Sequence, residues 1–194
     1  MAPGVRAQQR AQTRRTLITE ARRLFAARGY AAVGLSEIVA AAGVTKGALY
    51  HQFEGKDRLF RAVLDEVQQD VADSVASSAD AASDPWDRLL IGCRRFLTAA
   101  TEPTIQRILL IDGPAVLGWS EWRAGDAATS MRHLGDALTE LIDTGVIPEQ
   151  PVAPLTHLLS GAMNEAALWL ATSNDPADLD ATVRALESML SALK

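Results

Sequence analysis

The side chains between residues 45 and 52 are of the types that bond to a nucleic acid. Lys46 can donate a hydrogen bond to a guanine edge or to a phosphate, and Ala48 can pack against a thymine methyl group. The hydroxyls of Thr45 and Tyr50 can reach phosphate oxygens. A helix that exposed these residues on one side would be suited to the major groove of DNA.

Residues near this segment extend the set. Gly47 would let the helix backbone approach DNA closely. Lys56 would begin the next helix, where its charge and the helix N-terminus both favour a phosphate. Arg14 could hold the flanking DNA backbone. The candidate DNA-contacting residues are Arg14, Ser36, Thr45, Lys46, Gly47, Ala48, Tyr50, His51, Gln52 and Lys56.

Each of these assignments has a plainer alternative. Lys46 could be a solvated charge, and Tyr50 could be a half-buried packing residue with an exposed hydroxyl. His51 suits a position near a phosphate better than a base-reading role. The arginines of the first helix could form a solubilising face, which we expect for Arg22 and Arg23.

A pair of short helices would position the candidate residues. Ser36 is a good N-cap for the first helix, and Gly43 supplies a tight turn. The second helix would run from about residue 45 to 52 and bury Val44, Leu49 and Phe53. This is the pattern of a helix-turn-helix, in which the second helix enters the major groove while the first crosses the DNA backbone.

The charge of the chain is divided between its two ends. Residues 1–60 hold ten Lys and Arg against four Asp and Glu, a balance of +6. The whole chain carries −5, which leaves −11 for residues 61–194. A basic head on an acidic body suits DNA binding by the head, because the local field at the binding face governs docking.

The composition favours an all-α fold. The chain is rich in Ala and Leu, its aromatic content is 5%, and it lacks sustained β-branched alternation. We expect about nine helices, with a basic arm at residues 1–10 and a first helix ending at Gly29. The later helices are expected at 56–77, from Asp84-Pro85, from Pro103 to Gly113-Pro114, at 120–144, at 154–172 and from Asp175-Pro176.

Two domains follow from this pattern. Residues 1–55 would form the three-helix DNA-binding domain, and residues 56–194 would form a larger helical domain. In that larger domain the last two helices are apolar on more than one face, so each needs a second cover. A second copy of the chain could supply it through a four-helix bundle, although burial within one subunit is the alternative. The candidate interface residues are Leu158, Ala162, Leu179, Val183, Leu186 and Leu190.

Several classes of protein are disfavoured. Cys93 is the single cysteine, so neither an intrachain disulfide nor a cysteine metal cluster is expected, and a reducing cytoplasm fits. The apolar run from Ile108 to Trp119 is interrupted and too short to span a bilayer. No Glu-x-x-His pair is present and the three histidines are scattered, so we predict no metal, no cofactor and no enzymatic activity.

The residues of the helix-turn-helix resemble the DNA-binding domain of the TetR family of transcriptional regulators. The resemblance is carried by Ala42, Gly43, Val44, Thr45, Lys46, Gly47, Ala48, Leu49, Tyr50, Phe53 and Lys56, and extends back through Leu24, Phe25, Gly29 and Ser36. It covers about the first sixty residues. Two positions depart from the family pattern: Val39 stands where Ala is usual, and Gln52 stands where His is common.

The resemblance implies that the larger domain binds a small, largely apolar effector. Such binding would change the spacing of two DNA-reading helices in a homodimer. The conspicuous candidates for an effector site are Phe96, Asp112, Trp119, Trp122, Arg123, Asn164, Glu165 and Trp169. Ordinary core packing is the alternative for each, and it is favoured for Phe96.

We therefore expect a cytoplasmic, homodimeric transcriptional regulator, a repressor released from a palindromic double-stranded DNA operator by an effector. The alternative is a helix-turn-helix protein without a small-molecule effector, which would respond to a partner protein or act architecturally. The two differ in whether any small molecule weakens DNA binding.

Overall fold

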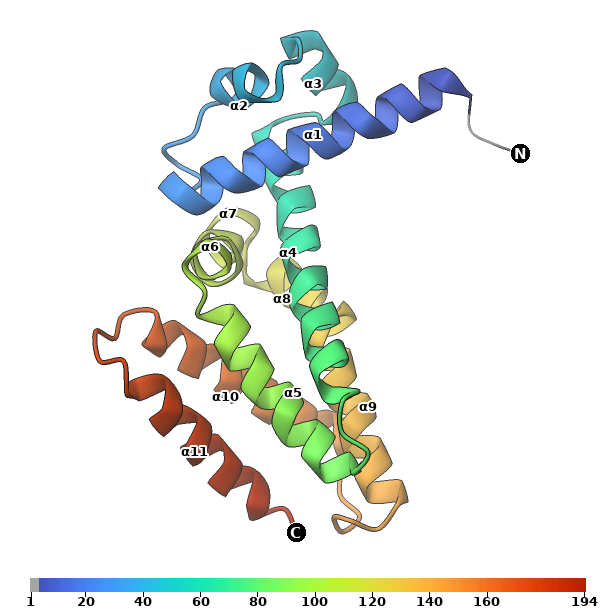
Figure 1. Ribbon diagram of the computed structural model, residues 1–194, viewed down its shortest axis with the longest axis vertical. Coiled ribbons are helices and arrows are strands. Elements are labelled where there is room, and N and C mark those ends of the chain that lie inside the picture. The colour runs from blue at the N-terminus through green and yellow to red at the C-terminus, as the bar shows by residue number, and fades with distance from the viewer. Residues whose placement is uncertain (1–3) are drawn as a thin grey trace.

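The computed structural model describes residues 4–194, and the regular structure of these residues is entirely helical, as predicted (Figure 1). The N-terminal head consists of α1 (Val5–Arg28), α2 (Leu35–Ala42) and α3 (Lys46–Gln52). The body contains α4 (Lys56–Ala79), α5 (Pro85–Ala100), α6 (Pro103–Gln106), the π-helical segment η1 (Arg107–Asp112), α7 (Gly113–Leu117), α8 (Trp119–Ala128), α9 (Ser130–Asp143), α10 (Val152–Leu170) and α11 (Asp178–Ser191).

The head folds around the apolar face of α1. Its core comprises Leu17, Ile18, Ala21, Leu24, Phe25, Ile38 and Leu49, all of them buried. Gly43 ends α2 in the left-handed conformation, with φ of 63°, as the predicted turn requires. Its N–H bonds to the Ala40 carbonyl, and the N–H of Val44 bonds to the Val39 carbonyl, both at 3.2 Å.

Two expectations about the head are wrong. The helix α1 begins at Val5, so residues 5–10 belong to it rather than to an arm. Ala, Arg and Gln dominate this stretch and favour helix; residues 1–3 of the expected arm lie outside the described residues. Ser36 lies in the first turn of α2, whose N-cap is Gly34 with no side-chain hydrogen bond.

The long helix α4 joins the head to the body. Figure 1 shows it leading from the crossing with α1 down to the far end of the molecule, alongside α5 and α9. Its buried face includes Leu59, Phe60, Val63, Val67 and Val71. The predicted cap of α5 is present, because Asp84 accepts hydrogen bonds from the N–H groups of Trp86 and Asp87 at 2.9 and 3.1 Å.

The middle of the body departs from the predicted boundaries. The helical run from Pro103 does not end at Gly113-Pro114 but continues to Leu117 through η1 and α7. Pro114 lies in the first turn of α7, where its missing N–H costs little. The predicted helix 120–144 is instead α8 and α9, separated at Thr129, which has φ of −123° and ψ of −107°.

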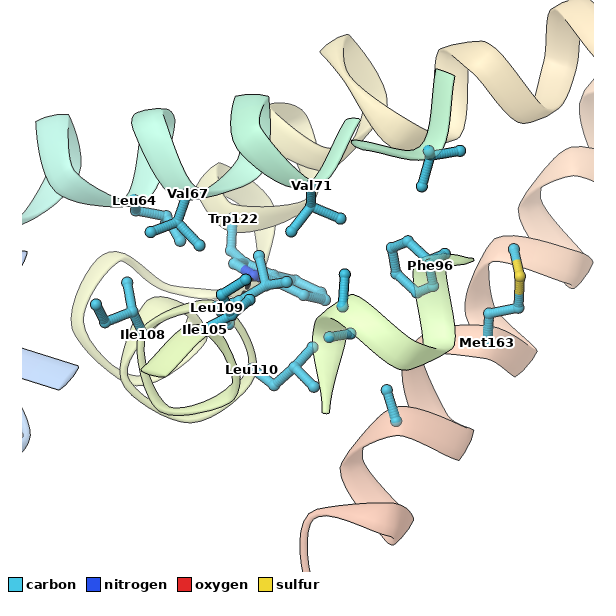
Figure 2. Packing of buried hydrophobic residues seen from close by; sticks show 14 of the residues in the cluster. Leu64, Val67, Val71, Phe96, Ile105, Ile108, Leu109, Leu110, Trp122 and Met163 are labelled. Atoms are coloured by element: carbon cyan, nitrogen blue, oxygen red, sulfur yellow. Dashed lines mark hydrogen bonds between the residues drawn. The ribbon is translucent and has the colours of Figure 1, made fainter. Parts of the chain in front are cut away.

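The core of the body lies between α4, α5, η1 and α8. Figure 2 shows Trp122 beside Leu109 and Val71, with Phe96 and Met163 farther along the same cluster. The Trp122 indole N–H donates to the Leu109 carbonyl at 2.7 Å, which links α8 to η1. Among residues 4–194, no helix has the length and hydropathy needed to cross a bilayer.

Candidate functional site

The helix α3 exposes the side predicted to meet DNA. Lys46, Gly47, Tyr50 and His51 are exposed, whereas Leu49 is fully buried against the head. Thr45 is the N-cap, and its hydroxyl accepts the N–H of Ala48 at 3.1 Å. This cap satisfies one of the free donors at the start of a short helix.

Gly47 has open space beside it. A Cβ added there would lie 3.9 Å from the Thr45 hydroxyl oxygen, which is an ordinary contact distance. The fold therefore does not require glycine at this position. A flat surface on α3 is what close approach to another backbone would require.

A row of arginines runs along α1 next to α3. Arg6, Arg10 and Arg14 recur every four residues, so they share one side of the helix. The Arg14 guanidinium lies over the Phe53 ring, 4.6 Å from its centroid. The Gln52 amide donates to the Arg10 carbonyl at 3.1 Å, so that amide is already engaged within the head.

Two other arginines of α1 have acidic partners within the chain. Arg22 pairs with Asp70 of α4, and Arg23 pairs with Glu20. Arg22 thereby joins α1 to α4, and the charges of both arginines are paired within the chain. The positive charge next to α3 therefore comes from the N-terminal half of α1.

The structure places Lys56 at the junction between head and body. Its ammonium nitrogen lies 4.0 Å from the centroid of the Tyr30 ring. Burial lowers the pKa of Lys56, and the nearby Asp112 carboxylate opposes that shift. Asp112 also accepts the backbone N–H of Tyr30 at 2.8 Å. Asp112 thus ties η1 to the head and does not line the cavity described next.

A cavity of about 280 Å³ lies in the body between α4, α5, α8, α9 and α10. This volume is close to the lower end of the range for small-molecule sites, roughly 300–1,000 Å³. Its apolar lining includes Val75, Leu89, Cys93, Phe96, Met131, Leu134 and Met163. Its polar lining consists of Asp80, Arg88, Asp126, Ser130, His133, Asp136, Glu140 and Ser160.

A buried carboxylate, Asp126 of α8, forms part of this wall and is only 6% exposed. Its Oδ2 atom pairs with Arg123 and accepts hydrogen bonds from Ser160 and Asn164 of α10, both at 3.2 Å. Burial raises the pKa of Asp126, whereas Arg123 and the two hydrogen bonds oppose that shift.

Four of the predicted effector residues lie at or beside the cavity. Phe96 lines it directly. Trp122 and Asn164 line a small adjoining space of about 10 Å³, which shares Phe96, Asp126 and Ser130 with the main cavity. Arg123 reaches the same region through its contacts with Asp126 and Ser160.

The other four predicted effector residues lie elsewhere. Asp112 is at the junction, and Trp119 is 64% exposed with its ring 5.0 Å from that of Trp122. Glu165 and Trp169 lie on the exposed face of α10. Asp126 was missed, although Arg123 and Asp126 have the three-residue spacing of a helical ion pair and so offered a signal.

The predicted dimer residues divide into two groups. Val183, Leu186 and Leu190 of α11 are at most 7% exposed within one subunit. Their assignment to the interface is wrong, because α11 packs them against its own body. Leu158 and Ala162 of α10 are exposed, and Leu179 is half-buried.

Comparison with known proteins decides the family. Residues 17–63 match the family described as bacterial regulatory proteins, tetR family. Residues 86–193, more than half of the chain, match the tetracyclin repressor-like C-terminal domain. The chain belongs to the TetR family of transcriptional regulators. Proteins of this family bind DNA through a helix-turn-helix and are not enzymes.

Individual relatives agree with this assignment. A TetR-family transcriptional regulator from Pectobacterium atrosepticum is 36% identical, with 96% of each chain covered and a TM-score of 0.81. The TetC protein of transposon Tn10 from Escherichia coli is 25% identical over 86% of this TetR-family chain and 84% of its own length. The A-factor receptor protein of Streptomyces griseus is 32% identical, but the match spans only 54% of that protein.

The structure of RolR in complex with its ligand resorcinol has the same fold. Its TM-score is 0.74, with 94% of this TetR-family chain and 89% of RolR covered. The two sequences are 22% identical, so the likeness concerns the fold alone.

Proposed function

We propose that this TetR-family regulator is a repressor that binds a near-palindromic operator as a homodimer and is released by a small molecule. The observation that carries the proposal is the cavity of about 280 Å³ in the body. It is enclosed partly by α4, the same helix that begins at the head. RolR binds resorcinol within the same fold, which supports a small-molecule ligand for this chain as well.

The DNA-contacting part of the proposal rests on α3 and its surroundings. Lys46, Gly47, Tyr50 and His51 form its exposed side, and the arginine row of α1 flanks it. In a dimer, two copies of α3 would enter successive major grooves. The half-sites would then lie about 34–36 Å apart, or a multiple of that distance.

The homodimer would form through the exposed faces of α10 and α11. Leu158, Trp169 and Met189 are 72%, 49% and 56% exposed, which is unusual for large apolar side chains. Small exposed residues on α10 and α11 and at the end of α11 would let two helix pairs approach closely: Gly161, Ala162, Ala181, Ala185 and Ala192. This face replaces the buried residues of α11 as the proposed interface.

The proposed release works through α4. Its far end supplies Val75, Ala76 and Ala79 to the cavity, and its first residue, Lys56, contacts Tyr30 of the head. A ligand shifts the equilibrium only by its difference in affinity for two conformations. Here the ligand would favour a conformation whose two heads no longer match the half-site spacing.

The test has two stages. Genome-fragment selection with the purified protein should first yield a near-palindromic operator. Operator binding is then measured by fluorescence anisotropy across a panel of small metabolites. The proposal expects at least one compound to weaken operator binding without unfolding the protein. An operator complex that no small molecule weakens would favour regulation by a partner protein.

A further inference from the structure

We propose that the Oδ1 atom of Asp126 anchors the ligand in the cavity, and that the ligand is a small, uncharged, ring-containing molecule with a hydroxyl group. This inference rests on the proposed function, because it assigns the chemistry of the same cavity. It is carried by the hydrogen bonding of one carboxylate and by the charges around it.

The two carboxylate oxygens of Asp126 differ in the hydrogen bonds that they accept. Oδ2 receives Arg123, Ser160 and Asn164, whereas no residue in the described part of the chain donates to Oδ1. Within residues 4–194, no fully buried side-chain oxygen or nitrogen lacks a hydrogen-bond partner. Oδ1 is therefore not fully buried, and the open space that Asp126 lines is the main cavity together with the small space adjoining it.

The carboxylate is held in place before any ligand arrives. Its three donors come from α8 and α10, which fixes the carboxylate plane from two elements. A ligand donor at Oδ1 would meet an acceptor that needs no reorganisation, which favours affinity. It would also complete the hydrogen bonding of a group that is 94% shielded from bulk solvent.

The charges of the lining exclude an anionic ligand. Asp126, Asp80, Asp136 and Glu140 line the cavity, whereas Arg88 is its one arginine or lysine among the described residues and pairs with Glu140. His133 also lines the cavity, but the four carboxylates outnumber the two groups that can carry positive charge, so a ligand carboxylate would be repelled. Like charges placed close together disfavour the charged form of each group.

A cationic ligand is also disfavoured next to Asp126. Arg123 already neutralises Asp126, so a second cation would lose its hydration without gaining a full ion pair. An uncharged hydroxyl can donate to Oδ1 without that desolvation cost. The apolar lining of Phe96, Met131 and Met163 suits a ring as the remainder of the ligand.

The test uses four probes with one ring system: 2-naphthol, naphthalene, 2-naphthoate and 2-naphthylmethylamine. Their affinities for the DNA-free protein are measured by calorimetry. A hydrogen bond to a charged acceptor should make 2-naphthol bind roughly 10- to 100-fold more tightly than naphthalene. The naphthoate and the amine should bind more weakly than the naphthol.

Two variants test whether the preference for 2-naphthol over naphthalene depends on Asp126. Asp126→Asn should bring the affinity of 2-naphthol close to that of naphthalene. Asp143→Asn, which changes an exposed carboxylate of α9 outside the cavity, should keep the difference. Circular dichroism and thermal melting check the folding of both variants, and the wild-type probe series remains decisive if Asp126→Asn unfolds.

The results that would contradict the Asp126 anchor differ from those that would contradict the proposed release of the operator by a ligand. Equal affinity of the wild type for 2-naphthol and naphthalene overturns the anchor. Tighter binding of the amine or the naphthoate, or no binding of any probe, overturns the ligand class. If 2-naphthol binds as expected but leaves operator binding unchanged, the site stands and the proposed release by ligand fails.

Discussion

Gly47 stands at an open position on the exposed side of α3. Gly47 is the second residue of α3. Glycine weakens a helix, because the unfolded chain loses more conformational freedom when it folds. The structure shows no crowding that would require it, since an added Cβ would have its nearest contact at 3.9 Å. The fold therefore does not account for a glycine here, whereas the proposed close approach to DNA does.

We predict that Gly47→Ala raises the free energy of unfolding by about 0.5–1 kcal/mol. The same change should weaken operator binding, because the methyl group holds α3 away from the DNA. Urea unfolding measures the first effect and fluorescence anisotropy the second. Unchanged operator affinity would show that the backbone of α3 does not approach DNA at this residue.

Cys93 is a second residue whose surroundings determine its chemistry. Burial raises the pKa of its thiol to about 12. The thiolate is the reactive form, and an exposed cysteine has a pKa of about 8.5. At pH 8 the buried thiol is therefore almost wholly protonated.

We predict that iodoacetamide modifies Cys93 of the native protein roughly a thousandfold more slowly at pH 8 than in urea, from the difference in thiolate fraction. Mass spectrometry at timed intervals measures both rates. A native rate within tenfold of the rate in urea would mean that the cavity wall opens readily at α5.

At the scale of elements, η1 connects the cavity wall to the head. Trp122 of α8 donates to the carbonyl of Leu109 in η1, and Asp112 at the end of η1 accepts the N–H of Tyr30. Trp122 lies one helical turn before Asp126, whose carboxylate lines the cavity. A shift of α8 on ligand binding would therefore reach the head through η1.

We predict that Asp112→Ala reduces the coupling between ligand and operator by about 1 kcal/mol, within the usual range of such couplings. Ligand affinity of the DNA-free protein should stay the same, because Asp112 does not line the cavity. The coupling free energy is calculated from the ratio of the operator affinities measured with and without ligand. Tyr30→Phe keeps the backbone N–H and should keep the coupling; equal loss in both variants would contradict this role for Asp112.

Elements with local signals were predictable from the sequence. The Asp84-Pro85 cap and the left-handed Gly43 turn each depend on a few neighbouring residues. The continuation through Pro114 and the break at Thr129 were not predicted, because they depend on tertiary packing. At Gly113, an added Cβ would lie 2.9 Å from a Trp122 ring carbon, so this helix is fitted closely to a side chain of another helix.

The candidate sites also differ in how far the sequence predicts them, because some depend on local spacing and others on tertiary packing. The exposed side of α3 follows from helical spacing within one short motif. On α11, Leu186 and Met189 are three positions apart and both apolar, yet one is 7% and the other 56% exposed. Which of them is buried depends on how α11 packs on α5. The role of Asp126 likewise depends on residues of α10, far along the chain.

At the scale of the whole molecule, the head and the body differ in the sign of their charge. The +6 of residues 1–60 lies where DNA would bind, and the −11 of residues 61–194 discourages wrapping of DNA onto the body. The helices α10 and α11, which carry the exposed Leu158, Trp169 and Met189, lie in the body away from the head in Figure 1. A second subunit on their exposed faces would leave both heads free to bind one duplex.

Leu158 provides the decisive test of this arrangement, because its side chain is 72% exposed and supports no core within one subunit. We predict that Leu158→Glu yields folded monomers with poor operator affinity, since a single head engages only one half-site. Sedimentation velocity measures the association state, and fluorescence anisotropy measures operator binding.

Ile111→Glu, at an exposed apolar position on η1, is the matched control and should stay dimeric. Leu186→Ala should instead cost about 2–5 kcal/mol of folding stability, because it opens a space in the core. A Leu158→Glu variant that sediments like the wild type would place the interface on another face.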